Sequence, residues 1–425
     1  MKTLEQVATS LQGYDPQALR ADTALQFLQT LVTPVAQSEC VELKAALGRV
    51  LAQDVVSPID VPAHDNSAMD GFAFHGALLQ SGQALRLEIA GTALAGAQWS
   101  GSVASSQCVK IMTGAVMPAG LDTVVAQELV QIDGLHITIP AGVLRQGDNR
   151  RFKGEDLAKG KPALLAGSRV GPATLGLLAS LNLAQVCVQR KLRVAFFSTG
   201  DEILSLGESP RDGAVYDSNR YTLFGLLTRM GVEVLDMGVV RDDPASLEAA
   251  FGVAATQADA IITSGGVSVG EADHTKAVMQ CMAGGPAGVA FWKIAMRPGR
   301  PMAVGRIGRA MLFGLPGNPV AVMVTFLAFV RPALLQMMGS TGHDTPLLRA
   351  RSTDAIRKKP GRTEYQRAIV QSGNDGSLQV RITGQQGSGV LSSMAAANGL
   401  LVLPHDQGNV AVGQEVDVLM FDGVM

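Results

Sequence analysis

Two stretches decide the fold of this chain: residues 192–202, LRVAFFSTGDE, and residues 260–270, AIITSGGVSVG. Each begins as an apolar run typical of a buried strand and ends in small and polar residues. Between them the sequence predicts a helix, a strand at 232–240 and a second helix that begins at an Asp-Pro pair, 243–244. Strands and helices that alternate in this way form parallel βαβ units. Residues 189–340 are therefore predicted to form a three-layer α/β domain around a parallel sheet.

The flanking regions have a different pattern, so we expect a multidomain α/β protein. Residues 57–158 are rich in glycine and short β-prone runs, which indicates an inserted, mostly β domain. Residues 1–56 and 159–188 are expected to form an N-terminal helical and linker region, with a helix over 41–56. Residues 341–425 alternate short strands with turns, which is typical of a small β-barrel or sandwich.

Composition excludes several classes of function. The chain has 35 Lys and Arg against 37 Asp and Glu, a net charge of −2, which argues against a nucleic-acid or membrane-surface binder. No signal peptide is visible at the N-terminus, and the apolar run at 320–330 is too short to span a bilayer. The cysteines are far apart and are expected to be buried, reduced thiols of a cytoplasmic protein, without a disulfide framework. They are Cys40, Cys108, Cys187 and Cys281.

A glycine-rich turn follows the strand predicted at 260–263. Glycines let the backbone approach an anion closely, and a helix that starts after such a loop favours phosphate. An ordinary strand-to-helix turn would have the same composition, and the turn matches neither a P-loop nor a dinucleotide fingerprint. The candidate phosphate-binding residues are Ser264, Gly265, Gly266, Ser268 and Gly270.

Carboxylates follow three successive strands of the predicted sheet. Asp201 and Glu202 come after the first strand, Asp242 and Asp243 after the second, and Glu271 and Asp273 after the third. Because the carboxyl ends of parallel strands meet at one edge, we expect these acids to lie together and to hold Mg²⁺ or activate water. For each acid taken alone, a separately solvated helix cap is the better explanation, and it is their convergence at one sheet edge that favours a metal site.

Two rigid turns are candidates for binding an anion. Residues 293–301, KIAMRPGRP, place Lys293, Arg297 and Arg300 on a turn stiffened by two prolines. Arginine presents a planar fork to oxyanions, although a solvated turn is the plain alternative. Residues 314–319, GLPGNP, precede a helix and aim backbone N–H groups at one point, with Pro316 and Pro319 as candidates.

The inserted domain contributes a polar loop, 65–73, DNSAMDGFA. Asp70-Gly71 is compatible with a simple hairpin turn, but nothing in the local pattern requires so many polar side chains for folding. Related polar loops occur at 113–114 and 154–156. No histidine has metal-ligand spacing, and no Ser-His-Asp order is present, which disfavours nucleophilic hydrolase chemistry.

Together these motifs resemble the molybdopterin molybdenumtransferases, the family of MoeA and the gephyrin E domain. The resemblance covers nearly the whole chain in the family's order, and its segments are 65–73, 111–114, 154–156, 198–202, 216–219, 264–273, 293–301 and 314–319. It implies an elongated homodimer of four subdomains. The active cleft would lie between the α/β unit of one subunit and the 57–158 domain of the other.

The resemblance also implies the reaction: molybdate is inserted into adenylyl-molybdopterin, AMP is released and molybdenum-molybdopterin results. A molybdopterin adenylyltransferase and acceptor molybdoenzymes would be partners. The implied roles are catalysis for Asp70, Thr113, Asp156, Glu202, Asp242 and Asp273; Mg²⁺ binding for Glu202, Asp242 and Asp273; and substrate binding for Ser264, Gly265, Gly266, Ser268, Gly270, Lys293, Arg297, Arg300, Pro316, Pro319, Arg367 and Ser388. The chain departs from the family in carrying Arg297 and Arg300 where lysines are frequent, which keeps the charge and changes the donor geometry.

Two alternatives remain open at this point. One is a molybdopterin adenylyltransferase that uses ATP on the α/β unit, although that unit alone would suffice for such an enzyme. The other is a non-enzymatic scaffold, because the gephyrin E domain also anchors receptor peptides. No linker or partner-binding tail is visible in the sequence.

Overall fold

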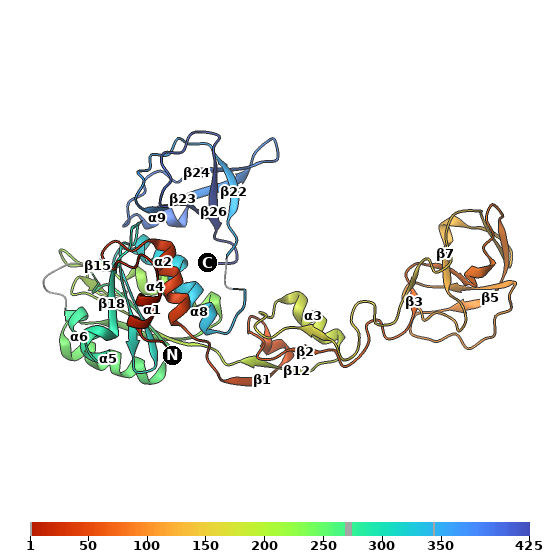
Figure 1. The fold of residues 1–425 in the computed structure, drawn as a ribbon, viewed down its shortest axis with the longest axis horizontal. Coiled ribbons are helices and arrows are strands. Elements are labelled where there is room, and N and C mark those ends of the chain that lie inside the picture. The colour runs from red at the N-terminus through yellow and green to blue at the C-terminus, as the bar shows by residue number, and fades with distance from the viewer. Residues whose placement is uncertain (1, 268–273, 343–344) are drawn as a thin grey trace. The chain divides into compact units, whose positions relative to one another are not determined.

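The computed structural model describes residues 2–267, 274–342 and 345–425 (Figure 1). The chain forms two compact units. The first comprises Met1–Ala52, Gly167–Gly171 and Gln185–Met425, and the second comprises Gln53–Ala166 and Pro172–Ala184. Residues expected in the N-terminal and linker region contribute to both units.

The first unit is built on a six-stranded sheet of order β16-β13-β17-β21-β20-β18. Its parallel strands are β13 (Arg193–Thr199), β16 (Glu233–Val240), β17 (Ala260–Ser264) and β21 (Ala310–Leu315), and its antiparallel edge is β20 (Pro301–Ile307) and β18 (Val289–Lys293). The parallel part confirms the predicted α/β fold. Because β13 pairs with both β16 and β17, the strand order reverses there, and the carboxyl ends of β13 and β17 form the switch point at which such sheets bind ligands.

Helices on both sides of this sheet begin at side-chain caps. The Asp217 carboxylate accepts from the N–H of Arg220 at 3.0 Å and starts α4 (Ser218–Met230), which ends at Gly231. The Asp243 carboxylate does the same for α5 (Pro244–Gln257). Two separate clusters of buried apolar side chains fill the two faces of the sheet. The other helices of this part are α1 (Leu4–Ser10), α2 (Ala21–Leu31), α6 (His274–Met282) and the 3₁₀ turn η4 (Pro286–Gly288).

One apolar helix runs through the core of the first unit. It consists of α7 (Pro319–Thr325), a π-helical turn η5 (Phe326–Val330) and α8 (Arg331–Met337). It is long and apolar enough to cross a membrane, with a mean hydropathy of 1.8, but 89% of that window is buried inside the protein. The apolar run at 320–330 was expected to be too short to span a bilayer, but the helix that contains it continues through Arg331-Pro332 to Met337. The N–H of Arg331 donates to Phe326 O, and this wider turn lets the helix continue through a proline that has no N–H of its own.

The C-terminal part of the first unit is a closed barrel, which confirms the predicted β domain. Its strands are β22 (Leu348–Ser352), β23 (Thr363–Ser372), β24 (Leu378–Ile382), β25 (Gly399–Leu403) and β26 (Glu415–Met420), with a short helix α9 (Leu391–Ala395). The barrel closes because β23 pairs with both β24 and β25. The short strand β19 (Met296–Arg297) pairs with β23, so the basic turn is attached to the barrel.

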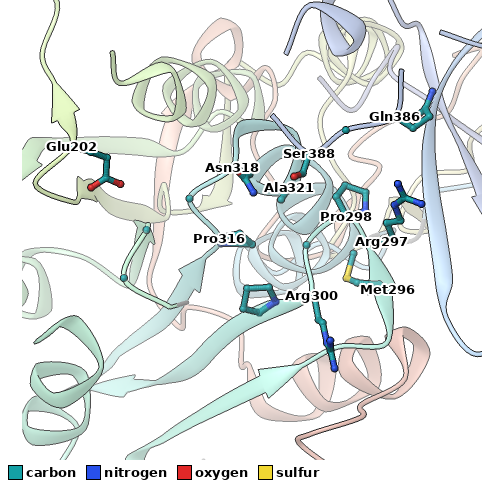
Figure 2. Close-up of a pocket in the computed structure, with 16 residues that line it drawn as sticks. Glu202, Met296, Arg297, Pro298, Arg300, Pro316, Asn318, Ala321, Gln386 and Ser388 are labelled. Carbon is teal, nitrogen blue, oxygen red and sulfur yellow. The ribbon is translucent and has the colours of Figure 1, made fainter. Parts of the chain in front are cut away.

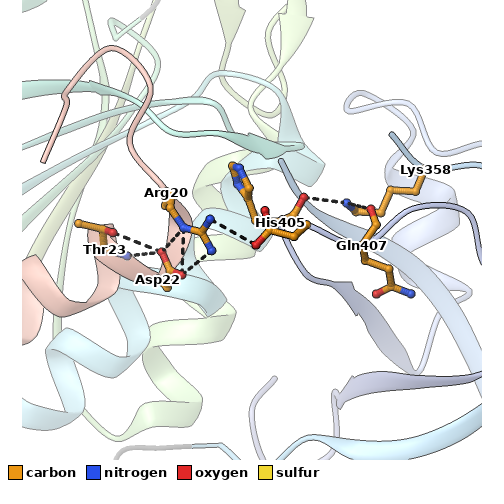
Figure 3. Close-up of polar contacts among 7 residues, drawn as sticks. Arg20, Asp22, Thr23, Lys358, His405 and Gln407 are labelled. Carbon is orange, nitrogen blue, oxygen red and sulfur yellow. Dashed lines mark hydrogen bonds and ion pairs between the residues drawn. The ribbon is translucent and has the colours of Figure 1, made fainter. Parts of the chain in front are cut away.

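A turn of the barrel also contacts the start of α2 (Figure 3). Arg20 donates to Asp22 at 3.0 Å and to Asp406 at 3.5 Å. The buried Lys358 ammonium donates to Gln407 O at 2.7 Å and to His405 O at 3.4 Å. Burial lowers the pKa of Lys358. These contacts hold the turn in one conformation beside the N-terminal segment.

The second unit has a six-stranded sheet of order β7-β4-β6-β5-β9-β8, which confirms a mostly β domain. The strands are β4 (Gly71–Phe74), β5 (Leu85–Ala93), β6 (Gln107–Ile111), β7 (Thr123–Ala126), β8 (Gln131–Asp133) and β9 (His136–Ile139), with 3₁₀ turns η2 (Gly76–Leu78) and η3 (Gln127–Leu129). Two short pairs join β2 (Val55–Val56) to β11 (Pro162–Leu164) and β3 (Asn66–Ser67) to β10 (Arg150–Arg151). Within residues 159–188, which were expected to belong to a helical and linker region, the structure has the helix α3 (Pro172–Ser180).

The predicted helix over 41–56 was wrong. This segment forms the end of β1 (Ser38–Glu42), the 3₁₀ turn η1 (Leu43–Ala46) and β2. β1 pairs with β12 (Gln185–Gln189), so a partner far along the chain decides its conformation, against its local helical spacing.

The expectation of four buried, reduced thiols was also wrong. Cys40 and Cys187 lie opposite each other on β1 and β12 and form a disulfide, although 147 residues separate them. Cys281 is an exposed free thiol. Only Cys108 fits the expectation, and burial raises the pKa of its thiol to about 12. Spacing along the sequence does not reveal which strands will be neighbours.

Candidate active site

The loops at the carboxyl ends of the central sheet and the basic turn line a cavity of about 580 Å³, called here the first cavity (Figure 2). The sheet contributes loops after β13, β17 and β21, and the barrel contributes the loop 386–388. The predicted site residues on its wall are Glu202, Gly265, Gly266, Arg297, Arg300, Pro316 and Ser388. Residues from distant parts of the sequence therefore meet at the carboxyl edge of the sheet.

The basic turn is held rigidly from several sides. The N–H of Ile294 donates to Arg300 O at 2.7 Å, and Met296 and Arg297 pair with β23. Gly299 has a left-handed φ of 92°, and a Cβ there would lie 2.4 Å from Thr325 Oγ1. The side chains of Arg297 and Arg300 are exposed and extend in different directions from this frame (Figure 2). The rigid turn thus fixes the backbone positions from which the two arginine side chains extend.

The first cavity is electrically asymmetric. Glu202 lies on one side of it and Arg297 on the other (Figure 2). Within the described part of the chain, neither Arg297 nor Arg300 has a carboxylate within salt-bridge distance. Burial lowers the pKa of the neighbouring Arg367, and the charge of Arg297 lowers it further. The cationic side of the cavity is therefore available to an anionic ligand.

The glycine turn after β17 is required by packing. Gly265 has a φ of 91°, and a Cβ there would lie 2.3 Å from Thr199 O. A Cβ on Gly266 would lie 2.5 Å from Thr275 Cβ. The N–H of Gly265 already donates to Leu315 O at 3.1 Å. Close contact with the end of β13 explains Gly265, and close contact with α6 explains Gly266, so their phosphate-binding role stays a prediction. Ser268 and Gly270 lie outside the described residues.

The three predicted metal ligands are not found together in the described part of the structure. Glu202 lines the first cavity. Asp242 accepts a hydrogen bond from Thr275 Oγ1 at 3.0 Å and is not among the residues that line this cavity. Asp273 lies outside the described residues. Among the residues that are described, no group of three His, Cys, Asp or Glu side chains could hold a metal ion.

A second cavity, of about 510 Å³, adjoins the first, and both have Glu202, Gly265, Gly317 and Asn318 in their walls. Its remaining residues include Thr199, Tyr216, Asp217, Asn219, Ser264, Pro319 and Gly389. The predicted residues Ser264 and Pro319 therefore belong to the second cavity. Asp217 and Asn219 were missed as site residues because a polar group at a helix start has the pattern of an ordinary cap. Their near-complete burial, at 3% and 6% exposure, is the signal that a sequence does not show.

The structure shows which groups surround two of the predicted substrate-binding residues, Arg367 and Lys293. Arg367 is fully buried, and its guanidinium donates to Ser393 Oγ, Gln385 O and Gly387 O, each at 2.9 Å. It therefore braces the loop that carries Ser388 to the first cavity. Lys293 ends β18, and its backbone pairs with Pro16 and Leu19; it is not among the residues that line the first cavity.

The second unit brings together two of its three predicted site residues. One carboxylate oxygen of Asp70 accepts from both the N–H and the hydroxyl of Thr113. The backbone N–H and then the hydroxyl lower the pKa of Asp70. Asp156 is exposed, and its own N–H donates to Val61 O at 3.1 Å. Asp65, in the same polar loop as Asp70, forms an ion pair with Arg150.

Family models match most of the chain in three consecutive segments. The MoeA N-terminal region (domain I and II) matches residues 19–182. A probable molybdopterin binding domain matches residues 195–336, and the MoeA C-terminal region (domain IV) matches residues 349–421. The two cavities lie among residues of the second and third segments.

Individual relatives agree with these matches over nearly full length. A molybdopterin molybdenumtransferase of Haemophilus influenzae is 40% identical over 401 residues, covering 94% of this chain and 98% of the relative. One from Nostoc sp. is 36% identical over 390 residues, covering 90% and 88%. A crystal structure of the molybdopterin biosynthesis moeA protein from Pyrococcus horikoshii OT3 superposes with a TM-score of 0.80 at 27% identity, covering 95% of this chain and 100% of that one.

Proposed function

The chain belongs to the molybdopterin molybdenumtransferase family, whose members insert molybdenum in molybdenum-cofactor biosynthesis, and we propose that its substrates are adenylyl-molybdopterin and molybdate. The products would be molybdenum-molybdopterin and AMP. The observation that carries this proposal is the first cavity, whose wall has Glu202 on one side and, on the other, the rigid turn with Arg297 and Arg300, which form no ion pair with a described carboxylate.

The cationic side of the first cavity suits molybdate and phosphate oxygens. Both are compact anions that accept hydrogen bonds in several directions, and a guanidinium offers them paired donors. Because the turn is fixed by β23 and by Gly299, little ordering of the backbone accompanies binding. Arg297 and Arg300, which extend in different directions, would each bind oxygens of molybdate or phosphate, and a guanidinium beside the phosphate would stabilise the negative charge that develops as AMP leaves.

We propose that Mg²⁺ takes part in the reaction and that Glu202, on the wall of the first cavity, would be one of its ligands. Hard cations take oxygen ligands and share them with substrate phosphates, which would offset part of the charge repulsion between two anionic substrates. The described residues do not form a ligand set by themselves. Asp273 and the substrate would have to complete it.

We also propose a homodimer, in which polar residues of one subunit's second unit would belong to the active site of the other subunit. Asp70 of the partner subunit and Thr113 of the partner subunit would approach the cavity, and Asp156 of the partner subunit would join them. The carboxylate of Asp70 is supported for this role by its two hydrogen bonds, which keep it ionised. We further propose a cytoplasmic location, a molybdopterin adenylyltransferase as supplier of substrate and molybdoenzymes as acceptors of the product.

The test is a turnover assay on the purified full-length chain. We expect AMP release and active cofactor when adenylyl-molybdopterin and molybdate are supplied, with the cofactor measured by reconstitution of an apo-molybdoenzyme. Glu202→Gln should lower the rate by at least about tenfold, as expected for loss of a charged group that acts on reacting atoms. Glu208→Gln is the matched control, because Glu208 is an exposed residue of the adjacent loop that lines neither cavity.

The same assay separates the alternatives. Formation of an adenylylated product from ATP and molybdopterin would identify an adenylyltransferase instead. Absence of turnover in both reactions, with a folded protein, would leave a scaffold function.

A further inference from the structure

In the polar wall of the second cavity, the donor and the acceptor of each hydrogen bond can be assigned. Ser198 donates its hydroxyl proton to Asp217 Oδ1 at 2.9 Å, because a carboxylate oxygen accepts. Ser198 Oγ also lies 3.1 Å from Ser264 Oγ. Since Ser198 already donates its hydroxyl proton to Asp217, Ser264 must be the donor in the bond between the two serines. The Ser264 hydroxyl proton therefore points away from the cavity, and its oxygen offers only lone pairs to a ligand.

The neighbouring groups on this wall are acceptors as well. Asn219 Nδ2 donates to Gly317 O at 2.7 Å, which orients the side chain and leaves Oδ1 as an acceptor. Among the described residues, Asn219 Oδ1 and Asp217 Oδ2 are buried acceptors without a hydrogen-bond partner, and the hydroxyl of Thr199, which can donate as well as accept, is also buried without one. Buried acceptors without partners are unfavourable, so this wall is incomplete until a donor-bearing group fills it.

The second cavity has room for a small organic ligand, and its wall includes an aromatic side chain. Tyr216 adds an aromatic ring to the wall, with its hydroxyl donating to Glu208 O at 2.9 Å. The volume of about 510 Å³ is far greater than a single ion needs. A phosphate group is the wrong chemistry here, because its oxygens accept hydrogen bonds and would face Asp217 Oδ2 and Asn219 Oδ1.

We propose that the second cavity binds the 2-amino-4-oxopyrimidine edge of the pterin, with Asp217 as the residue that selects its adjacent N–H and NH₂ donors. This inference rests on the proposed function and deepens it. Adenine carries a single amino donor flanked by ring acceptors, so it matches the acceptor wall less well than a pterin does. The first cavity adjoins the second through Gly265, Gly317 and Asn318, so a pterin bound here directs its anionic substituents toward Arg297.

The experiment uses two probes that both keep the N3–H: pterin, and lumazine, in which an oxygen replaces the 2-amino group and N1 carries a proton. Equilibrium dialysis on the full chain should give at least about tenfold tighter binding of pterin, as expected for a hydrogen bond to a charged group. In Asp217→Asn this preference should fall below about threefold. Asparagine is as good a helix N-cap as aspartate, so α4 should remain intact, which thermal unfolding checks.

Asp212→Asn is the control, because Asp212 is an exposed carboxylate that lines neither cavity and should leave the preference unchanged. Equal binding of pterin and lumazine by the wild type, tighter binding of AMP that depends on Asp217, or Asp217-dependent binding of Mg²⁺ without any of pterin would each overturn the inference. Molybdenum insertion without a pterin preference would overturn only this inference. A pterin preference without insertion would overturn only the proposed function.

Discussion

Asp70 and Thr113 are joined by two hydrogen bonds to one carboxylate oxygen, from the N–H of Thr113 at 2.7 Å and from its hydroxyl at 2.8 Å. Both residues are exposed, and no other described residue hydrogen-bonds to this carboxylate. The second oxygen of Asp70 is therefore free, and the bonds to the first lower the pKa of the group. Such an arrangement orients an ionised carboxylate on a surface without using it for folding.

Asp70→Asn should therefore lower molybdenum insertion by at least about tenfold and leave the thermal unfolding temperature unchanged. Thr113→Val keeps the backbone hydrogen bond and loses that from the hydroxyl. It should raise the pKa of Asp70 toward its ordinary value and reduce activity less than Asp70→Asn does. Rates and NMR titration of the carboxyl group measure both effects. Full activity in Asp70→Asn would show that this carboxylate is not used.

Substitutions of Arg297 separate the effect of its positive charge from the effect of its planar donor geometry. Arg297→Lys retains the cation and loses the planar fork, whereas Arg297→Ala loses both. We expect the KM for molybdate to rise by about fivefold in the lysine variant and by at least about twentyfold in the alanine variant, since hydrogen bonds to charged groups contribute about 1.5–3 kcal/mol. Steady-state kinetics at fixed adenylyl-molybdopterin measure this.

Arg309→Ala is the control, because Arg309 lies in the turn between β20 and β21 and lines neither cavity. An unchanged KM in Arg297→Ala would place the oxyanion elsewhere.

Local chemistry explains which features could be predicted from the sequence. The alternation of apolar runs and caps indicated the parallel sheet and the starts of α4 and α5, because neighbouring residues determine these elements. The rule that parallel strands end at one edge predicted that Glu202 and Asp242 would lie together, but Glu202 lines the first cavity and Asp242 is not among the residues of its wall. Predictions from the sequence succeeded where one element supplies the whole signal.

Features that depend on distant partners were not predictable in this way. The strand β1 exists because β12 pairs with it, and the same pairing brings Cys40 and Cys187 together. The acceptor character of Ser264 depends on Ser198 and Asp217, which come from different elements. A sequence shows which polar residues are present, but tertiary structure decides which of their lone pairs remain free.

The Cys40–Cys187 disulfide should stabilise the first unit measurably. It closes a loop with a sequence separation of 147, for which chain entropy gives at most about 5 kcal/mol. The second unit lies almost entirely inside this loop and can remain folded, so the actual loss on reduction should be smaller. Urea unfolding with and without dithiothreitol measures the difference.

Cys40→Ser should be less stable and insensitive to dithiothreitol, whereas Cys281→Ser should respond as the wild type does, because Cys281 is a free thiol. Mass spectrometry that found four free thiols in the unreduced protein would contradict the prediction.

The ion pair between Asp259 and Arg190 should make stability depend on pH. The guanidinium donates to both carboxylate oxygens, at 2.6 and 2.7 Å, and the N–H of Arg193 adds a third bond at 2.8 Å. Burial opposes ionisation of Asp259, but these bonds outweigh it and lower its pKa. The pair lies before β17, at the opposite end of that strand from the cavities. Asp259→Asn should therefore affect stability and not turnover per folded molecule.

A carboxyl group whose pKa is lowered by folding stabilises the protein above its unfolded-state pKa and loses that contribution as pH falls through the folded-state value. Asp259→Asn should therefore cost about 2 kcal/mol at pH 7, since one fifth of each side chain is exposed and screening reduces the value for a fully buried pair. The difference from the wild type should shrink on acidification below the ordinary range of aspartate. Urea unfolding across this pH range measures it. Glu233→Gln removes a more exposed pair with Arg193 and should have no measurable effect, and an equal loss in both variants would contradict the role assigned to Asp259.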